Sequence, residues 1–69
     1  MKITARQIPS QNDEYVVTLL NVDGRPIKSE IVISLKGTID IVREWSEENG
    51  GCPHTIKTLD GRTLTGESE

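Results

Sequence analysis

Apolar and polar residues alternate along three stretches in the first half of the chain, and this period of two is typical of β-strands. Residues 2–8 alternate weakly, whereas residues 15–22 and 27–34 are rich in β-branched and apolar side chains. The dipeptide Asp23-Gly24 separates the last two runs and favours a two-residue type I′ hairpin loop. The pattern therefore predicts a strand followed by a β-hairpin.

The period changes to that of a helix over residues 38–49. Thr38 can cap the start of this helix, and a start at Ser34 with Gly37 in the first turn is the alternative. The run Asn-Gly-Gly at 49–51 tolerates the left-handed conformation and ends the helix. One side of the helical wheel carries the apolar residues Ile39, Ile41, Val42 and Trp45.

The last part of the chain repeats an earlier segment. The sequence LDGRTLTGE at 59–67 is a near copy of VDGRPIKSE at 22–30, and both copies fall where an extended run must reverse. Turn chemistry explains the repeat, with strands over 55–59 and 62–65, and an internal duplication is the alternative.

These elements predict one α+β domain over residues 1–65 and a flexible acidic tail over 66–69. The expected fold is a small, mainly antiparallel sheet of four or five strands with one amphipathic helix across one face, in the order β-β-β-α-β-(β). The order over residues 14–65, including GTIDIVREWSEENGG after the second strand of the hairpin, resembles the β-grasp plan of ubiquitin-like domains. Its strand–turn–strand–helix portion equally resembles many small bacterial and phage regulatory proteins. The resemblance implies a layout alone, because the chain ends in GESE and lacks the terminal Gly-Gly of conjugation and sulfur-carrier proteins.

A two-residue loop at Asp23-Gly24 would place Leu20 opposite Ile27, Thr18 opposite Ser29 and Val16 opposite Ile31. It would divide the hairpin into two faces, both partly apolar. The first carries Val16, Leu20, Val22, Ile27, Ile31 and Ile33 and is expected to lie under the helix. The second would stay open, because one helix covers only one side of a small sheet. Scattered surface aliphatics would explain this second face equally well, but a cluster around a tyrosine favours an interface. We therefore predict a partner face that consists of Tyr15, Val17, Leu19, Lys28, Glu30 and Val32.

Composition restricts the partners further. The 69 residues are 33% hydrophobic and 28% charged, which is typical of a folded soluble domain, and the only aromatic residues are Tyr15 and Trp45. The net charge of −3, with both signs interspersed, makes nucleic-acid binding an unfavourable expectation. No apolar run approaches the roughly 20 residues of a membrane span, and the N-terminus has no apolar signal region, so a cytoplasmic protein without membrane contact is expected.

Candidate chemistry is sparse. The segment Cys52-Pro53-His54 brings together a thiol and an imidazole, but no third group orients them for nucleophilic catalysis, and one Cys and one His cannot fill a zinc site. We predict no catalytic residue, no metal and no cofactor. Arg25 and Arg62 follow equivalent turns and would form an anion or nucleic-acid contact if both turns lie at one end of the sheet. The alternative is that each flanks a turn in solvent.

The sequence therefore predicts a small, non-catalytic, intracellular interaction or regulatory module. Its partner would be another protein or a second copy in a homodimer, and no small-molecule substrate is inferred. Two alternatives are a thiol enzyme that acts through Cys52 and a protein that binds nucleic acid on a sheet surface. The nucleic-acid alternative would use Lys2, Arg6, Arg25, Lys28 and Arg62.

Overall fold

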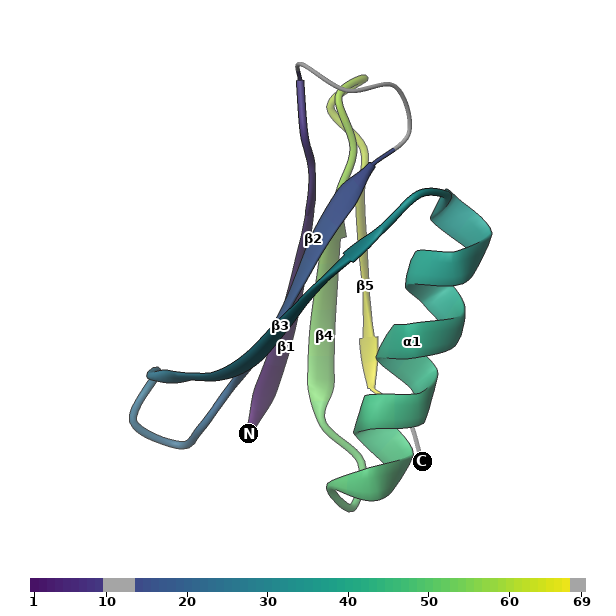
Figure 1. Ribbon diagram of the computed structural model, residues 1–69. Coiled ribbons are helices and arrows are strands. Elements are labelled where there is room, and N and C mark those ends of the chain that lie inside the picture. Colours follow the sequence, from purple (N-terminus) through teal and green to yellow (C-terminus); the bar gives the residue numbers. More distant parts are fainter. Residues whose placement is uncertain (10–13, 68–69) are drawn as a thin grey trace.

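A computed structural model of the protein describes residues 1–9 and 14–67, with the backbone alone for residues 65–67. Within these residues, five strands form one mixed sheet and one helix lies across one of its faces (Figure 1). The elements are β1 Lys2–Gln7, β2 Tyr15–Leu20, β3 Pro26–Val32, α1 Leu35–Glu48, β4 Pro53–Lys57 and β5 Thr63–Glu67. The predicted α+β class and order of elements are confirmed. β5 continues through Gly66 and Glu67, where a tail was expected, and residues 68–69 lie outside the described residues.

The strand order is β3-β2-β1-β4-β5, and β1 with β4 is the parallel pair in an otherwise antiparallel sheet. α1 connects β3 to β4 and so passes over β2 and β1. β3 and β5 are the two edges. Because β2 runs against β1 and β4 runs with it, the turn after β2 and the turn after β4 lie at opposite ends of the sheet (Figure 1).

The turn between β2 and β3 is a loop of three residues. Asn21 N donates to Arg25 O at 2.8 Å, and Gly24 N donates to Asn21 O at 3.0 Å. Gly24 has a φ of 83°, whereas no non-glycine among the described residues has a positive φ. The predicted type I′ turn is therefore wrong, since it needs a positive φ at Asp23 as well. The loop is instead a tight turn closed by a left-handed glycine, which is the common three-residue hairpin.

The turn between β4 and β5 has the same form. Thr58 N donates to Arg62 O at 3.1 Å, Gly61 N donates to Thr58 O at 3.3 Å, and the φ of Gly61 is 87°. Both Asp-Gly-Arg segments thus place glycine at the one position that requires a left-handed residue. Turn geometry accounts for the repeat, as the sequence predicted.

The register of β2 with β3 survives the longer loop. Thr18 lies opposite Ser29 as predicted, but the register shifts between Leu19 and Leu20 and leaves Ile27 as an extra residue in β3. The three-residue loop displaces the pairing by one position, and this bulge restores it. The expected pairing of Leu20 with Ile27 is therefore wrong, while the pairings farther from the turn are right.

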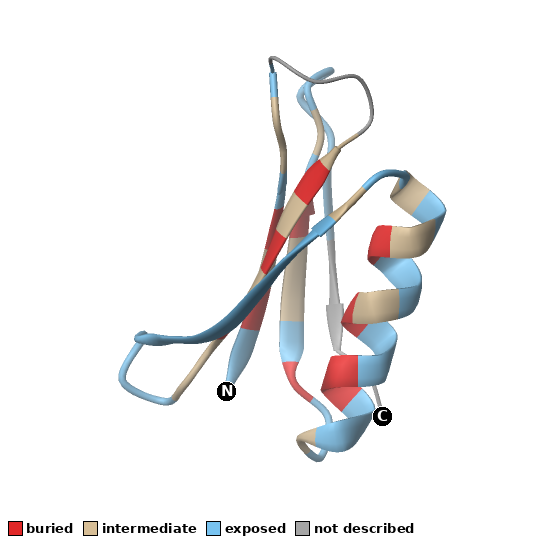
Figure 2. Ribbon diagram, in the orientation of Figure 1, coloured by how far each residue is buried: buried red, intermediate tan, exposed pale blue. Residues whose placement is uncertain are grey.

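The helix covers the face of the sheet opposite to the one expected. Tyr15, Val17 and Leu19 are only 3%, 0% and 3% exposed and belong to the core, and Val32 packs against it. The prediction that these residues form an open partner face is wrong. Figure 2 shows buried positions alternating along β2, whereas β3 is exposed over nearly its whole length. The core consists of Ile3, Ala5, Tyr15, Val17, Leu19, Val42, Trp45, Cys52 and Ile56.

Central strands β1 and β4 decide which face is buried. Ala5 lies beside Val17 on one side and beside Ile56 on the other, so three apolar side chains from three strands share one face. On the opposite face the corresponding positions of β1 and β4 hold Arg6 and Lys57. The hairpin alone is apolar on both faces, and the helix packs where β1 and β4 are apolar too.

The helix begins earlier than residue 38. Ser34 is the N-cap, because its Oγ accepts a hydrogen bond from Gly37 N at 3.0 Å, so the alternative start is confirmed. Thr38, the other candidate cap, is buried and donates its hydroxyl to Ser34 O at 2.8 Å. Val42 and Trp45 face the core as predicted, whereas Ile39 remains exposed.

Hydrogen bonds connect the C-terminal end of α1 to the segment that leads into β4. Gly51 N donates to Ser46 O at 2.7 Å and Gly50 N donates to Glu47 O at 3.3 Å, which is a Schellman motif. The buried hydroxyl of Ser46 also accepts from Cys52 N at 2.8 Å. These bonds hold the chain close to the helix end as it enters β4.

The burial pattern predicts unequal costs for two truncations on neighbouring strands. Leu19→Ala removes a buried side chain and should lower the free energy of unfolding by about 2–5 kcal/mol. Ile31→Ala, at a position 61% exposed on the other face, should change it by no more than about 0.5 kcal/mol. Urea denaturation of both variants measures the difference. A larger loss for Ile31→Ala would mean that the helix covers the other face.

A second prediction concerns Gly37, whose added Cβ would lie 2.8 Å from Val32 Cγ1. Alanine favours a helix over glycine, yet Gly37→Ala should destabilise the protein by about 1–2 kcal/mol, because the β-branched Val32 cannot move aside easily. Denaturation midpoints measure this loss. Val32→Ala should cost less in the Gly37→Ala background than in the wild type, and equal costs in both backgrounds would contradict the predicted close contact.

Candidate interaction surface

The open face of the sheet is the face that α1 does not cover. Side chains point to it from alternate positions of each strand, in the registers that the strand pairs define. Its described residues are Lys2, Thr4 and Arg6 on β1, Val16, Thr18 and Leu20 on β2, Ser29 and Ile31 on β3, Pro53, Thr55 and Lys57 on β4, and Thr63 on β5.

One half of the open face is apolar. Val16 and Ile31 lie opposite each other across β2 and β3, and Leu20 lies on the same side nearer the turn. The bulge residue Ile27 is 49% exposed, and Ile33, just after β3, is 77% exposed. We call Val16, Leu20 and Ile31, together with the neighbouring bulge residue Ile27, the apolar half. Exposed aliphatic residues gathered on adjacent strands are typical of binding surfaces.

The other half of the open face is basic. Arg6 and Lys57 are neighbours across the parallel pair of β1 and β4, and Lys2 lies farther along β1. We call these three residues the basic half. They border a shallow hollow of about 280 Å³ that is also lined by Thr4, Ala5 and Thr55.

Charge is divided between the two sides of the molecule. No acidic side chain is described on the open face, although the register of β5 also assigns the position of Glu67, opposite Pro53, to this face. The helix on the other side carries four acids against two bases, namely Asp40, Glu44, Glu47 and Glu48 against Lys36 and Arg43. A protein with a net charge of −3 therefore presents three cations, Lys2, Arg6 and Lys57, on its uncovered sheet surface.

The predicted partner face lies on the helix side in full. Lys28 extends over Trp45, with its Nζ 4.6 Å from the ring centroid, and forms an ion pair with Glu48 at 3.5 Å. Lys28 and Glu30 are thus not the rim of an open apolar surface, because their strand positions face α1. The apolar half, which the sequence assigned to the core, was missed. The signal that could have found it is the alternation in β1, where Ile3 and Ala5 oppose Lys2 and Arg6.

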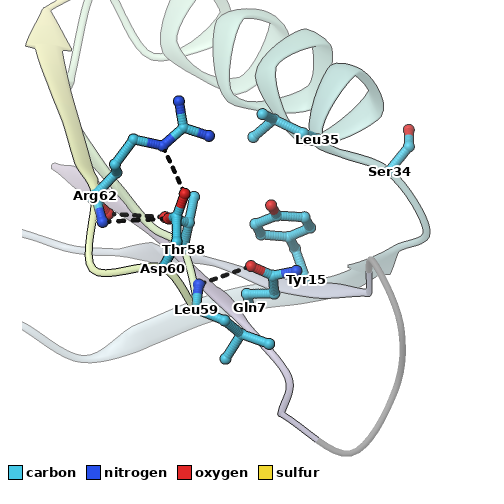
Figure 3. Close-up of a pocket in the computed structure, with 8 residues that line it drawn as sticks. All are labelled: Gln7, Tyr15, Ser34, Leu35, Thr58, Leu59, Asp60 and Arg62. Carbon is cyan, nitrogen blue, oxygen red and sulfur yellow. Dashed lines mark hydrogen bonds and ion pairs between the residues drawn. The ribbon is translucent and has the colours of Figure 1, made fainter.

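A second hollow, of about 420 Å³, lies at the end of the sheet where α1 begins (Figure 3). Arg62 Nε is 2.9 Å from Asp60 Oδ2, and the Thr58 hydroxyl donates to the other carboxylate oxygen of Asp60. Leu59 N donates to Gln7 Oε1 at 2.8 Å. These bonds hold the β4–β5 turn in place against β1. The remaining lining residues are Tyr15, Ser34 and Leu35.

The two turn arginines do not form a shared anion site. Arg25 and Arg62 lie at opposite ends of the sheet, because β2 and β4 run in opposite directions (Figure 1). The predicted pairing is wrong. Arg62 instead forms an ion pair with Asp60 in its own turn, which leaves the pair with no net charge.

The thiol of Cys52 and the imidazole of His54 lie in the segment where the chain passes from α1 into β4. Cys52 is 2% exposed, and its Sγ donates to Asn49 O at 3.8 Å. The Nδ1 atom of His54 is buried and has no hydrogen-bond partner among the described residues. Across residues 1–9 and 14–67, the structure shows no group of three or more His, Cys, Asp or Glu side chains that could hold a metal ion. No helix formed by the described residues has the length and apolar character to cross a membrane.

Comparisons with known protein families, with curated proteins and with solved structures find no match to this chain. The resemblance to the β-grasp plan therefore stays a prediction, and function has to be argued from the surface itself.

The turn of the second hollow yields a prediction about pH. The hydrogen bond from Thr58 lowers the pKa of Asp60 most, and Arg62 lowers it further. Since its pKa is lower in the folded than in the unfolded protein, Asp60 stabilises the fold above its ordinary value of about 3.9, and this contribution is lost as the pH falls through the lowered pKa. Thr58→Val should raise the pKa of Asp60, as measured by NMR titration of its carboxyl carbon. An unchanged pKa would mean that the Thr58 hydroxyl does not bond to Asp60 in solution.

Proposed function

We propose that this protein is a small, non-catalytic interaction module that binds a partner protein on the open face of its sheet. The expectation of an apolar binding face is kept, but it moves to the other side of the sheet and to other residues. A regulatory role in the cytoplasm is part of the same proposal. The observation that carries this proposal is the apolar half, in which the side chain of Ile31 on β3 is 61% exposed.

The two halves of the open face suit a particular kind of partner. Contact with the apolar half removes exposed aliphatic surface from water, which supplies the favourable term of association. The basic half lies beside it and would meet carboxylates at the margin of the contact, where charge pairs set orientation and association rate. We therefore propose a partner segment that combines aliphatic side chains with Asp or Glu.

The chemistry of the open face supports binding rather than catalysis. Its described side chains supply aliphatic, hydroxyl and cationic groups, and none of them is a carboxylate, imidazole or thiol of the kind that acts as a general base or nucleophile. Thr18, Thr4 and Thr55 form a row across β2, β1 and β4 on this face, and their hydroxyls can donate or accept hydrogen bonds.

Nucleic-acid binding is the second candidate, and the clustering of Lys2, Arg6 and Lys57 favours it. Of the residues the sequence suggested for this role, Lys28 lies on the helix side, and the two turn arginines lie at opposite ends of the sheet because β2 and β4 run in opposite directions. Single strands are usually held by aromatic stacking, yet Tyr15 and Trp45, the chain's two aromatic residues, are buried in the core between the helix and the sheet. Protein binding therefore ranks first.

Selection of peptides from a random displayed library tests the proposal, because such a selection does not require the partner to be named. We expect enriched peptides to combine aliphatic and acidic residues, and their affinity to fall as salt is added. Lys57→Glu should lower the affinity for these peptides about tenfold or more, and Val16→Asp should lower it to a similar extent. Fluorescence anisotropy with a labelled peptide measures both effects.

Arg43→Glu, a charge reversal on the exposed side of the helix, is the matched control and should leave peptide affinity unchanged. Circular dichroism confirms that each variant is folded. Peptides that bind the Lys57→Glu and Val16→Asp variants as tightly as the wild type would place the binding site elsewhere. Retention of the wild type on heparin at physiological salt, with no peptide enriched, would favour nucleic acid instead.

A further inference from the structure

β3 is an edge strand whose outer side pairs with nothing among the described residues. Six of its seven residues are exposed. An edge of this kind presents a row of backbone N–H and C=O groups that a further strand can use. Pro26, which cannot donate a backbone hydrogen bond, stands at the first position of the strand, so the rest of the edge keeps its donors.

The sequence of this edge is complementary to itself when reversed. The five residues Ile-Lys-Ser-Glu-Ile at 27–31 read as apolar, cation, hydroxyl, anion, apolar about Ser29. We infer that β3 pairs in an antiparallel manner with β3 of a second copy, with Ser29 on the two-fold axis. Lys28 of each copy then lies opposite Glu30 of the other, and Ile27 lies opposite Ile31.

The strand geometry agrees with this pairing on both sides of the sheet. In an antiparallel pair, directly opposite residues point to the same face. Lys28 and Glu30 both occupy the helix side, and Ser29 and Ile31 both occupy the open face. The two charge pairs would therefore form on the helix side, and the aliphatic contacts on the open face.

Neighbouring registers are unfavourable. Centring the pair on Lys28 or on Glu30 places like charges directly opposite each other, which destabilises a sheet. A shift by a single position sets residues of the helix side against residues of the open face, which the alternation of a sheet does not allow. Of the registers centred on Lys28, Ser29 and Glu30, the one centred on Ser29 places opposite charges together and keeps the two sides of the sheet matched.

The helix does not obstruct a second copy. α1 packs mainly across β2, with β1 and β3 on either side. Strands are spaced about 4.8 Å apart, so a helix over β2 lies about 7 Å from the two-fold axis, and the two helices lie about 14 Å apart. Directly packed helices approach to about 8–10 Å, which leaves room for the side chains of both.

Glu30 can form an ion pair with Lys28 of a second copy. It has no ion-pair partner among the described residues, whereas Lys28 already contacts Glu48 at 3.5 Å. That pair is solvent-exposed on both sides, so its ammonium can also approach Glu30 of a second copy. The resulting sheet is continuous through both copies and brings their two apolar halves side by side on one surface.

Sedimentation equilibrium from about 1 µM to about 1 mM protein tests the inference through charge reversal. The wild type should form a concentration-dependent dimer. Glu30→Lys and Lys28→Glu each place like charges opposite each other at two positions, and each should weaken the dimer about tenfold or more. An equimolar mixture of the two variants restores opposite charges at both positions and should dimerise at least as well as the wild type.

Lys36→Glu and Glu47→Lys, charge reversals on the helix away from the edge, are the controls and should not change dimerisation. A second measurement does not depend on charge. In a Cys52→Ser background, Ser29→Cys should form a disulfide between two copies under mild oxidation, because opposite Cα atoms lie about 4.5–5.5 Å apart. A wild type that stays monomeric throughout, or a dimer unaffected by either edge variant, overturns the inference.

The two proposals fail separately. Lys28 and Glu30 lie on the helix side, whereas Lys57 and Val16 lie on the open face. A dimer that is weakened by Lys57→Glu or Val16→Asp but not by the edge variants would be a dimer of open faces. Peptide binding that persists in monomeric Glu30→Lys would keep the proposed function while restricting the edge to self-association.

Discussion

Packing of a single helix on one face of the sheet is the constraint on which the rest of the structure depends. A chain of 69 residues builds one core, and a core of this size supplies roughly 3–5 kcal/mol of net stability. Val42 and Trp45 of α1 cover Ile3, Val17 and Ile56 from three different strands. Nothing in the described chain remains to cover the other face. The open face therefore exists because residues 1–9 and 14–67 form one helix, and the residues of that face are in contact with water.

The type and order of the elements were predictable, because each rests on local signals. The period of two in the strands, the helical period after Ser34 and the Gly-Gly pair at the helix end all correspond to observed features. The length of the hairpin loops was harder to predict from the sequence. Asp-Gly suits loops of two or three residues, and the side chain of Asn21, which accepts from Asp23 N and Arg25 N at 2.9 Å, stabilises the longer one.

The site could not be predicted, because the choice of face is a property of the whole sheet. Val16 and Val17 are neighbours of nearly equal hydrophobicity, and no local rule decides which of them is buried. The decision comes from β1 and β4, which present Ala5 and Ile56 to one face and Arg6 and Lys57 to the other. The parallel pairing of β1 with β4 joins residues about fifty positions apart, and a reading of the hairpin alone cannot include it.

Binding of the proposed partner would be coupled to folding in a domain of this size. A partner that binds the folded protein but not the unfolded chain adds to stability in proportion to the logarithm of its concentration over its dissociation constant. With so small an intrinsic stability, this addition becomes a large fraction of the total. Val16 and Leu20 are already half-buried within the sheet, so a partner on the open face would extend the core across β2 to its other side. The proposed partner would thus add a second apolar layer over β2 and β3, on the side of the sheet opposite to the layer that α1 supplies.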